Sequence, residues 1–211
     1  GTIWISDSTG AVSRIQEGKV RGFGTTEGLA GHGICWLATD TQGQFWFSQA
    51  GRVGIFRNGG FVTLLQVGPQ TARMAPARER GLWLAVGLKL FRYQAGGDLA
   101  AVTELKLESG GPEVAVTALY EDKARGLWIG TSSGGLFRFD AQGIQSVTTS
   151  HPNIINISED AEGNLWVGTR GGGLNRLSPR AVQLQGVASG LPFAAVQSAG
   201  EDAAGTLWVA G

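Results

Sequence analysis

The sequence contains few of the residues from which small catalytic and metal sites are built. Its 211 residues include one Cys, one Met, two Tyr and two His. A single cysteine excludes a disulfide within the chain, and the apolar neighbours of Cys35 indicate a small buried core residue. His32 and His151 lack the converging His, Cys or Asp residues that a metal site requires. We therefore expect neither a metal nor another cofactor.

Charge and long apolar stretches are also scarce. Charged residues make up 16% of the chain, and 17 basic residues balance 17 acidic ones. Proteins that bind nucleic acid or an anionic membrane surface carry a basic excess, so the balance argues against both partners. No apolar run approaches the roughly 20 residues of a membrane-spanning helix. No basic segment followed by a short apolar run indicates a signal peptide in these residues.

Glycine and tryptophan, by contrast, are abundant, with 35 Gly and 7 Trp. Six of the tryptophans follow a glycine by two or three residues and recur at intervals of 42, 37, 45, 38 and 42 residues: Trp4, Trp46, Trp83, Trp128, Trp166 and Trp208. The segments 121–131, 159–169 and 201–209 are nearly superimposable. An internal repeat at a fixed period is the signature of a repeat architecture.

Each copy of the repeat is predicted to contain four short strands separated by tight turns. In the copy at 111–150, strands are expected at 116–120, around Trp128, at 136–139 and at 144–148. Four strands in about 40 residues is the length of a propeller blade. One blade cannot bury its own faces, so blades stack around an axis, and each Trp fills the wedge beside its blade. The sequence therefore predicts an all-β fold: a β-propeller of four-stranded antiparallel blades with five to six blade repeats.

The repeats divide the chain into complete and partial blades within one expected β-propeller domain, residues 1–211. Complete blades are predicted at 32–66, 67–110, 111–150 and 151–188, and partial blades at 1–23 and 194–211. Two arrangements are consistent with partial blades at both ends of the sequence. In the first, the strand at 194–200 completes the N-terminal blade and closes a five-bladed ring, which leaves the Trp208 strand surplus. In the second, the chain is a fragment of a ring of seven or more blades, and the surplus strand favours this arrangement.

Two further residue types recur with the Trp. An Asp stands six residues before it in four copies, at Asp40, Asp122, Asp160 and Asp202, whereas Ala77 takes that place in the third copy. An Arg recurs in the third strand, at Arg14, Arg57, Arg92, Arg138 and Arg176. A residue that recurs in nearly every blade has a structural role in the blade. We therefore interpret the Asp as a turn residue and the Arg as half of an ion pair, not as catalytic groups.

The repeat resembles the two-component regulator propeller repeat. The resemblance rests on Gly-Asn-Leu-Trp-Val-Gly-Thr at 163–169, on Gly-Gly-Gly-Leu-Asn-Arg-Leu at 171–177, and on the linking segments 26–29 and 189–192. It is strong over 111–211, fair over 1–60 and poor over 67–105. The resemblance implies the extracytoplasmic sensor part of a bacterial signalling protein, ahead of a membrane span and a histidine kinase, diguanylate cyclase or DNA-binding output. No output segment is present in these residues.

The candidate ligand contacts are rim residues that do not repeat, because propeller function usually lies in loops carried by a rigid ring. Aromatic, Arg, Asn and His side chains together suit an anionic or sugar-like ligand. The predicted ligand-binding residues are His32, Trp36, Arg52, His151, Asn153, Asn156, Arg170 and Phe193.

The residues and the resemblance together predict a non-catalytic, ligand-sensing propeller that binds a small molecule or an oligosaccharide, and the resemblance implies a periplasmic location. Self-association or contact with a partner signalling domain is also expected. Two alternatives stay open: a propeller enzyme, either a lyase similar to streptogramin lyase or a glycosidase, and a scaffold that only mediates protein interaction or dimerisation. The small number of His residues argues against the lyase. The repetition of the Asp argues against the glycosidase.

Overall fold

The computed structural model describes residues 1–69, 72–94, 99–106, 114–178, 187, 190, 192, 197–204 and 206–210. They belong to two compact units, residues 1–177 and 178–211. No helical segment within these ranges is long and apolar enough to cross a membrane.

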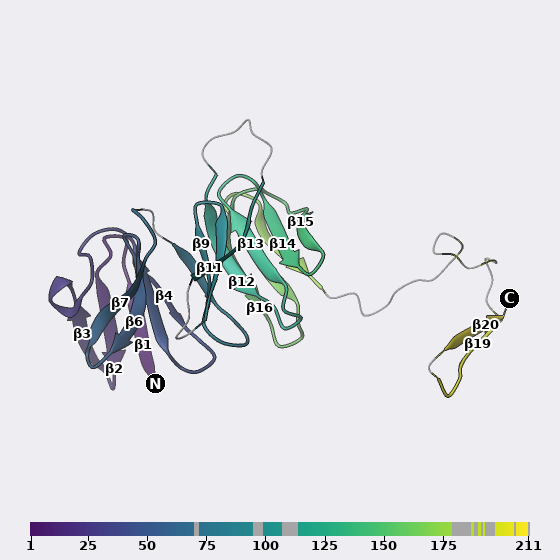
Figure 1. Ribbon diagram of the computed structural model, residues 1–211, viewed down its shortest axis with the longest axis horizontal. Coiled ribbons are helices and arrows are strands. Elements are labelled where there is room, and N and C mark those ends of the chain that lie inside the picture. Colours follow the sequence, from purple (N-terminus) through teal and green to yellow (C-terminus); the bar gives the residue numbers. More distant parts are fainter. Residues whose placement is uncertain are drawn as a thin grey trace. The chain divides into compact units, whose positions relative to one another are not determined.

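The first unit consists of five antiparallel sheets in which each strand pairs with its neighbour in sequence (Figure 1). The first sheet contains β1 (Thr2–Ser6), β2 (Val12–Gln16) and β3 (Lys19–Phe23), and the 3-10 turn η1 (Thr25–Glu27) follows it. The second contains β4 (Trp36–Thr39), β5 (Phe45–Gln49), β6 (Arg52–Arg57) and β7 (Gly60–Gln66). The third contains β8 (Arg73–Pro76), β9 (Leu82–Val86), β10 (Lys89–Tyr93) and β11 (Leu99–Glu104).

The remaining sheets continue the same pattern. The fourth contains β12 (Val116–Glu121), β13 (Leu127–Thr131), β14 (Leu136–Asp140) and β15 (Gly143–Val147). The described strands of the fifth are β16 (Ile154–Glu159), β17 (Leu165–Thr169) and β18 (Gly173–Leu177). In the second unit, β19 (Ser198–Glu201) and β20 (Leu207–Ala210) form a hairpin.

Contacts between the first strands of successive sheets identify the fold. β4 contacts β8, β8 contacts β12, and β12 contacts β16, so these four strands are the innermost strands of their blades. The described strands of the first unit form five antiparallel blades of an all-β propeller, and this confirms the predicted class. The recurring Trp lies on the strand next to the innermost one, as expected, because Trp46, Trp83, Trp128 and Trp166 belong to β5, β9, β13 and β17.

Apolar wedges between neighbouring blades form the core. In the first wedge, Trp4 stacks on Phe45 with ring centroids 4.5 Å apart, beside the buried Phe23, Phe47 and Phe61. The next three wedges contain Trp46, Trp83 and Trp128 in turn, each packed in a cluster that includes residues of the following blade. Aromatic side chains bury roughly 150–250 Å² each, so the repeating Trp is a principal source of stability between blades.

The recurring Asp holds the Trp of its own blade. The Oδ2 atoms of Asp40, Asp122, Asp160 and Asp202 accept the indole N–H of the Trp six residues later at 2.9, 2.8, 2.8 and 2.9 Å. In each case Oδ1 accepts backbone N–H groups of the turn that follows. The prediction of a turn residue is confirmed. In the third blade Ala77 cannot accept this bond, and the buried Nε1 of Trp83 has no hydrogen-bond partner within the described ranges.

Four of the five recurring Arg residues lie over the Trp of their blade. The guanidinium carbons of Arg14, Arg92, Arg138 and Arg176 stand 5.3–5.8 Å from the centroids of their Trp rings. Arg138 forms the predicted ion pair: its Nε is 3.8 Å from Asp122 of the neighbouring acidic pair, and its Nη1 is 2.7 Å from Asp140. For the other recurring Arg residues the ion-pair prediction is wrong, since no acidic partner lies within reach among the residues that the structure describes. Stacking on an indole stabilises a cation without a carboxylate.

Candidate functional site

The strongest candidate site lies along the innermost strands of the second, third and fourth blades. β4, β8 and β12 begin with Trp36, Arg73 and Val116, respectively. The Arg73 side chain connects all three strands. Its guanidinium carbon is 3.5 Å from the centroid of the Trp36 ring, and its Nε donates to the backbone carbonyl of Val116 at 3.3 Å.

The guanidinium of Arg73 is incompletely paired. Its Nη1 is buried and has no hydrogen-bond partner in the part of the chain that the structure describes. No carboxylate lies within 4 Å of it in the described part of the chain. Burial lowers the pKa of Arg73 to about 10, so the group still carries its charge at neutral pH. A half-buried cation with an unused donor is able to attract an anionic group.

A cavity of about 360 Å³ lies along the same three strands. Its apolar wall includes Leu37 from β4, Met74 and Pro76 from β8, and Leu119 from β12. Its polar lining is supplied by Thr41, Arg78, Tyr120 and Glu121. An apolar cavity with a few polar groups at one end is typical of a small-molecule pocket.

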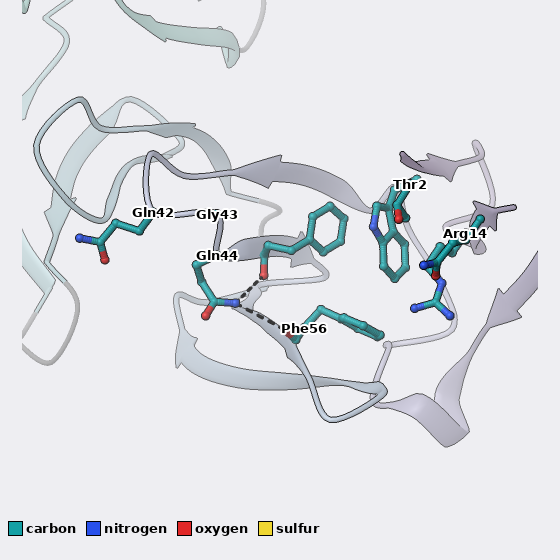
Figure 2. Close-up of a pocket in the computed structure, with 9 residues that line it drawn as sticks. Thr2, Arg14, Gln42, Gly43, Gln44 and Phe56 are labelled. Carbon is teal, nitrogen blue, oxygen red and sulfur yellow. Dashed lines mark hydrogen bonds between the residues drawn. The ribbon is translucent and has the colours of Figure 1, made fainter.

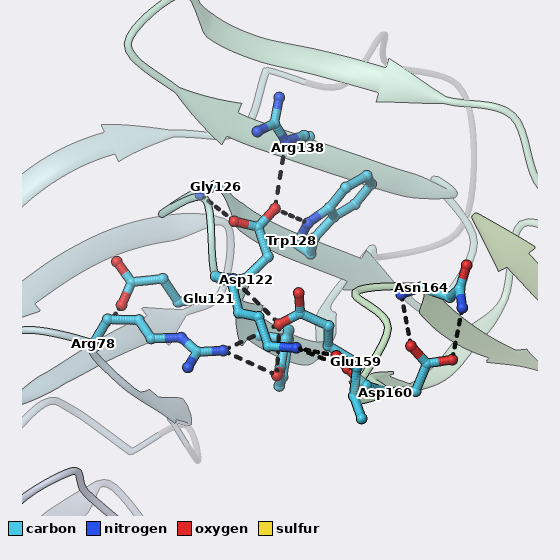
Figure 3. A network of polar contacts seen from close by, with 12 residues as sticks. Arg78, Glu121, Asp122, Gly126, Trp128, Arg138, Glu159, Asp160 and Asn164 are labelled. Carbon is cyan, nitrogen blue, oxygen red and sulfur yellow. Dashed lines mark hydrogen bonds and ion pairs between the residues drawn. The ribbon is translucent and has the colours of Figure 1, made fainter. Parts of the chain in front are cut away.

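A polar network joins the third, fourth and fifth blades beside the cavity (Figure 3). Oε2 of Glu159 accepts hydrogen bonds from Arg78 Nη2 at 3.1 Å, from the Tyr120 hydroxyl at 3.3 Å and from the Lys123 backbone N–H at 3.2 Å. The backbone N–H of Arg78 donates to Glu121. Burial raises the pKa of Tyr120, and the nearby negative charge of Glu159 adds to this increase. Tyr120 is therefore a neutral hydroxyl that donates to Glu159.

A second hollow, about 570 Å³ in volume, lies between the first two blades (Figure 2). Trp4 and Arg14 line it from the first blade, and Phe45 and Phe56 line it from the second. Nε2 of Gln44 is bound to the carbonyls of Phe45 and Phe56 at 3.3 and 3.4 Å. The lining contains no acidic side chain, and its polar groups are the amides, hydroxyl and guanidinium of a blade edge. We therefore place the candidate site at the innermost strands.

The predicted rim residues fall into separate groups. His151, Asn153 and Arg170 are brought together between the fourth and fifth blades, where the Asn153 N–H donates to His151 Nδ1 at 3.1 Å and the Arg170 N–H donates to the Asn153 carbonyl at 2.9 Å. Nε2 of His151 lies beside the turn at Gly171. Asn156 is exposed, and its side chain accepts from the N–H of Ile157. Phe193 lies outside the described residues.

The other predicted residues lie on the second blade. His32 is exposed, with Nδ1 3.1 Å from the Ala30 carbonyl. Arg52 is half-buried and begins β6. Trp36 is the one predicted residue that belongs to the site at the innermost strands, where it covers Arg73.

The loop that carries His32 is fixed by a buried amide. Oε1 of Gln49, a fully buried side chain, accepts from the Ala30 N–H at 2.8 Å. Its Nε2 donates to the carbonyls of Gly10 and Gly33 at 2.9 and 3.0 Å. Gly10 has a φ of +92°, and a Cβ there would collide with the Gly33 carbonyl oxygen, so only glycine fits. Gln49 therefore ties the loop to the turn between β1 and β2.

Sequence reasoning missed Arg73, Arg78 and Tyr120. A signal for Arg73 was its place at the start of an expected innermost strand, equivalent to that of Trp36. The residues described here include no group of three or more His, Cys, Asp or Glu that could hold a metal ion. Cys35 is buried, and burial raises its pKa to about 12, which keeps the thiol protonated and unreactive.

Comparisons with known proteins agree with the repeat. The two-component regulator propeller family matches residues 110–133 and 149–171. These segments belong to the fourth and fifth blades and contain the Trp128 and Trp166 strands. No curated protein sequence matches the chain.

Several solved structures share the fold. The extracellular domain of BT4673 from B. thetaiotaomicron, described as a one-component system, is 19% identical with a TM-score of 0.72, and the alignment covers 100% of this chain and 31% of that one. This chain therefore spans about a third of the length of that extracellular domain. Virginiamycin B lyase from Staphylococcus aureus is 16% identical with a TM-score of 0.62, and the alignment covers 100% of this chain and 73% of the lyase. At these identities the similarity establishes the fold alone.

Proposed function

We propose that this chain, whose fourth and fifth blades carry two-component regulator propeller repeats, is a ligand-sensing propeller of a bacterial signalling protein and acts outside the cytoplasm. The family match supports the signalling context. The observation that carries ligand binding is the cavity of about 360 Å³ along β4, β8 and β12, with apolar walls and a polar end. Such a cavity encloses a small organic molecule and orients it through a few polar groups.

The state of the nearby carboxylates supports binding over catalysis. Glu121 and Glu159 are the acidic groups closest to the cavity in the polar network, and both accept hydrogen bonds that join different blades. A general acid or base must exchange a proton with the substrate. Carboxylates whose hydrogen bonds hold three blades together have a structural role and are engaged by the protein itself. We therefore assign the site to ligand recognition.

A thermal-shift screen of the full 211-residue chain against oligosaccharides and small metabolites tests this function. At least one ligand class is expected to raise Tm in a concentration-dependent way, because a ligand that binds only the folded state stabilises it. Ala38→Leu narrows the cavity and should reduce the shift. Ala141→Leu, in the exposed turn between β14 and β15, is the matched control and should leave it unchanged. A chain whose Tm responds to no ligand would contradict sensing and favour a scaffold.

A further inference from the structure

Arg73 differs from Arg92, Arg138 and Arg176, three arginines that lie over the Trp of their own blade and have hydrogen-bond or ion-pair partners. Arg92 donates to two backbone carbonyls, those of Leu82 and Tyr93. Arg138 is paired with Asp140. Among the described residues, Arg73 makes one hydrogen bond, through Nε, and its buried Nη1 has no partner. A buried donor without a partner destabilises the folded protein, so its presence on an innermost strand suggests a compensating group that binds there.

The geometry restricts where that group can bind. The Trp36 ring lies 3.5 Å from the guanidinium carbon and covers one face of the group. Nε is already bound to the Val116 carbonyl, so the free hydrogen-bonding edge is the one that includes Nη1. Hydrogen bonds to a guanidinium lie in its plane, and a planar carboxylate can accept two of them side by side.

The charge and the surroundings restrict its chemistry. One guanidinium balances one negative charge, which suits a carboxylate better than a dianionic phosphate. Arg73 and Trp36 do not line the cavity themselves, but the next residue of each strand does, Met74 on β8 and Leu37 on β4, and Leu119 adds a further apolar wall. A ligand with a carboxylate at one end and an apolar body would satisfy both features.

We infer that Arg73 and Trp36 form an anion site that binds the carboxylate of a small organic acid whose apolar part occupies the neighbouring cavity. This inference rests on the proposed function and names its ligand class. Trp36 contributes by holding the guanidinium plane fixed, and Val116 does so by occupying Nε. Neither contact neutralises the charge of Arg73, and that charge is what selects an acid over its neutral analogue.

The test is an NMR titration of the ¹⁵N-labelled full chain, followed at the Trp36 indole resonance, which Trp36→Phe assigns. Benzoate is expected to shift this resonance in a saturable way, with acetate weaker and the neutral benzamide without saturable effect. Arg73→Gln should weaken benzoate binding at least tenfold. Arg176→Gln, which removes an exposed Arg stacked on Trp166 and bound to Asn164, should bind as the unmodified chain does.

Three results of this titration would contradict the anion site. Benzoate binding that survives Arg73→Gln, benzamide binding equal to benzoate, or phosphate binding tighter than benzoate would overturn the inference. If Arg73→Gln fails to fold, as judged from the indole resonances of the other tryptophans, Arg73→Lys serves instead. This substitution keeps the positive charge but removes the planar guanidinium, so it should weaken benzoate binding severalfold. Unchanged affinity for benzoate would contradict a carboxylate bound in the plane of the guanidinium. A thermal-shift response to other ligands that is unaffected by Arg73→Gln would overturn the anion site and leave the sensing function standing.

Discussion

Trp83 shows what one missing carboxylate does to a blade. In three blades and in the hairpin of the second unit, the indole N–H donates to the Asp, but the third blade has Ala77 there, and the buried Nε1 of Trp83 has no partner among the described residues. The backbone of the third blade keeps the turn, because the Ala77 N–H still donates to the Gly81 carbonyl at 3.0 Å. The position therefore has the backbone geometry of the other blades without the side-chain acceptor.

Restoring the acceptor should stabilise the protein. We expect Ala77→Asp to raise the free energy of unfolding by about 1 kcal/mol, the net value of one satisfied hydrogen bond. Urea denaturation measures the change. Trp83→Phe removes the donor, so Ala77→Asp should give no gain in the free energy of unfolding when it is introduced into the Trp83→Phe protein. An Ala77→Asp protein that is less stable than the starting protein would show that the third blade cannot accommodate the carboxylate.

Asp160 makes the stability of the propeller depend on pH. Burial opposes its charge, but hydrogen bonds from Asn164 and Trp166 outweigh burial and lower its pKa from 3.8 to about 2. A carboxyl whose pKa is lower in the folded state stabilises the fold above its unfolded pKa, and this stabilisation is lost as pH falls from about 4 towards 2. Asp160→Asn should therefore lower Tm at pH 5 and flatten its decline between pH 4 and 2. Parallel Tm curves for the two proteins would contradict this.

At the scale of elements, one buried carboxylate connects three blades. Glu159 ends β16, and its Oε2 accepts from Arg78 after β8, Tyr120 on β12 and the backbone of Lys123 (Figure 3). The side chain of Glu159 is 5% exposed and that of Arg78 is 38% exposed. The ion pair is therefore partly open to water, and most of the stabilisation should come from the hydrogen bonds to the buried carboxylate.

Glu159→Ala should lower the free energy of unfolding by about 1–3 kcal/mol, because it leaves the Tyr120 hydroxyl and the Lys123 N–H without their acceptor. A double-mutant cycle with Arg78→Ala isolates the ion pair, and we expect a coupling energy of about 0.5–1 kcal/mol. Additive single changes would indicate that Arg78 and Glu159 are neighbours without energetic coupling.

Gln49 has a comparable role between the first two blades. Gln49→Ala leaves the carbonyls of Gly10 and Gly33 and the N–H of Ala30 without a partner, so a loss of about 2–3 kcal/mol in the free energy of unfolding is expected. Hydrogen exchange should accelerate in the loop at 24–33 before the rest of the blade opens. Uniform exchange across the second blade would contradict this assignment.

At the scale of the whole molecule, the fold could be predicted from the sequence because its stabilising parts repeat. The regularly spaced Trp residues, the Asp before four of them and the short alternating strands all follow from local blade geometry. The site could not be predicted in the same way. The unpaired state of Arg73 depends on the residues that β4 and β12 place beside it. A repeat pattern cannot predict such a contact, because the residues that make it do not recur from blade to blade. Trp36 was predicted as a ligand residue, and its partner Arg73 lay in the blade with the poorest repeat.

Hydrogen–deuterium exchange with and without saturating benzoate tests the central claim, recognition along the innermost strands, most directly. The account predicts slower exchange in β4, β8 and β12, around Trp36, Arg73 and Val116, with the outer strands β7, β11 and β15 unchanged. Slower exchange confined to the outer strands, or no difference along the chain, would contradict it.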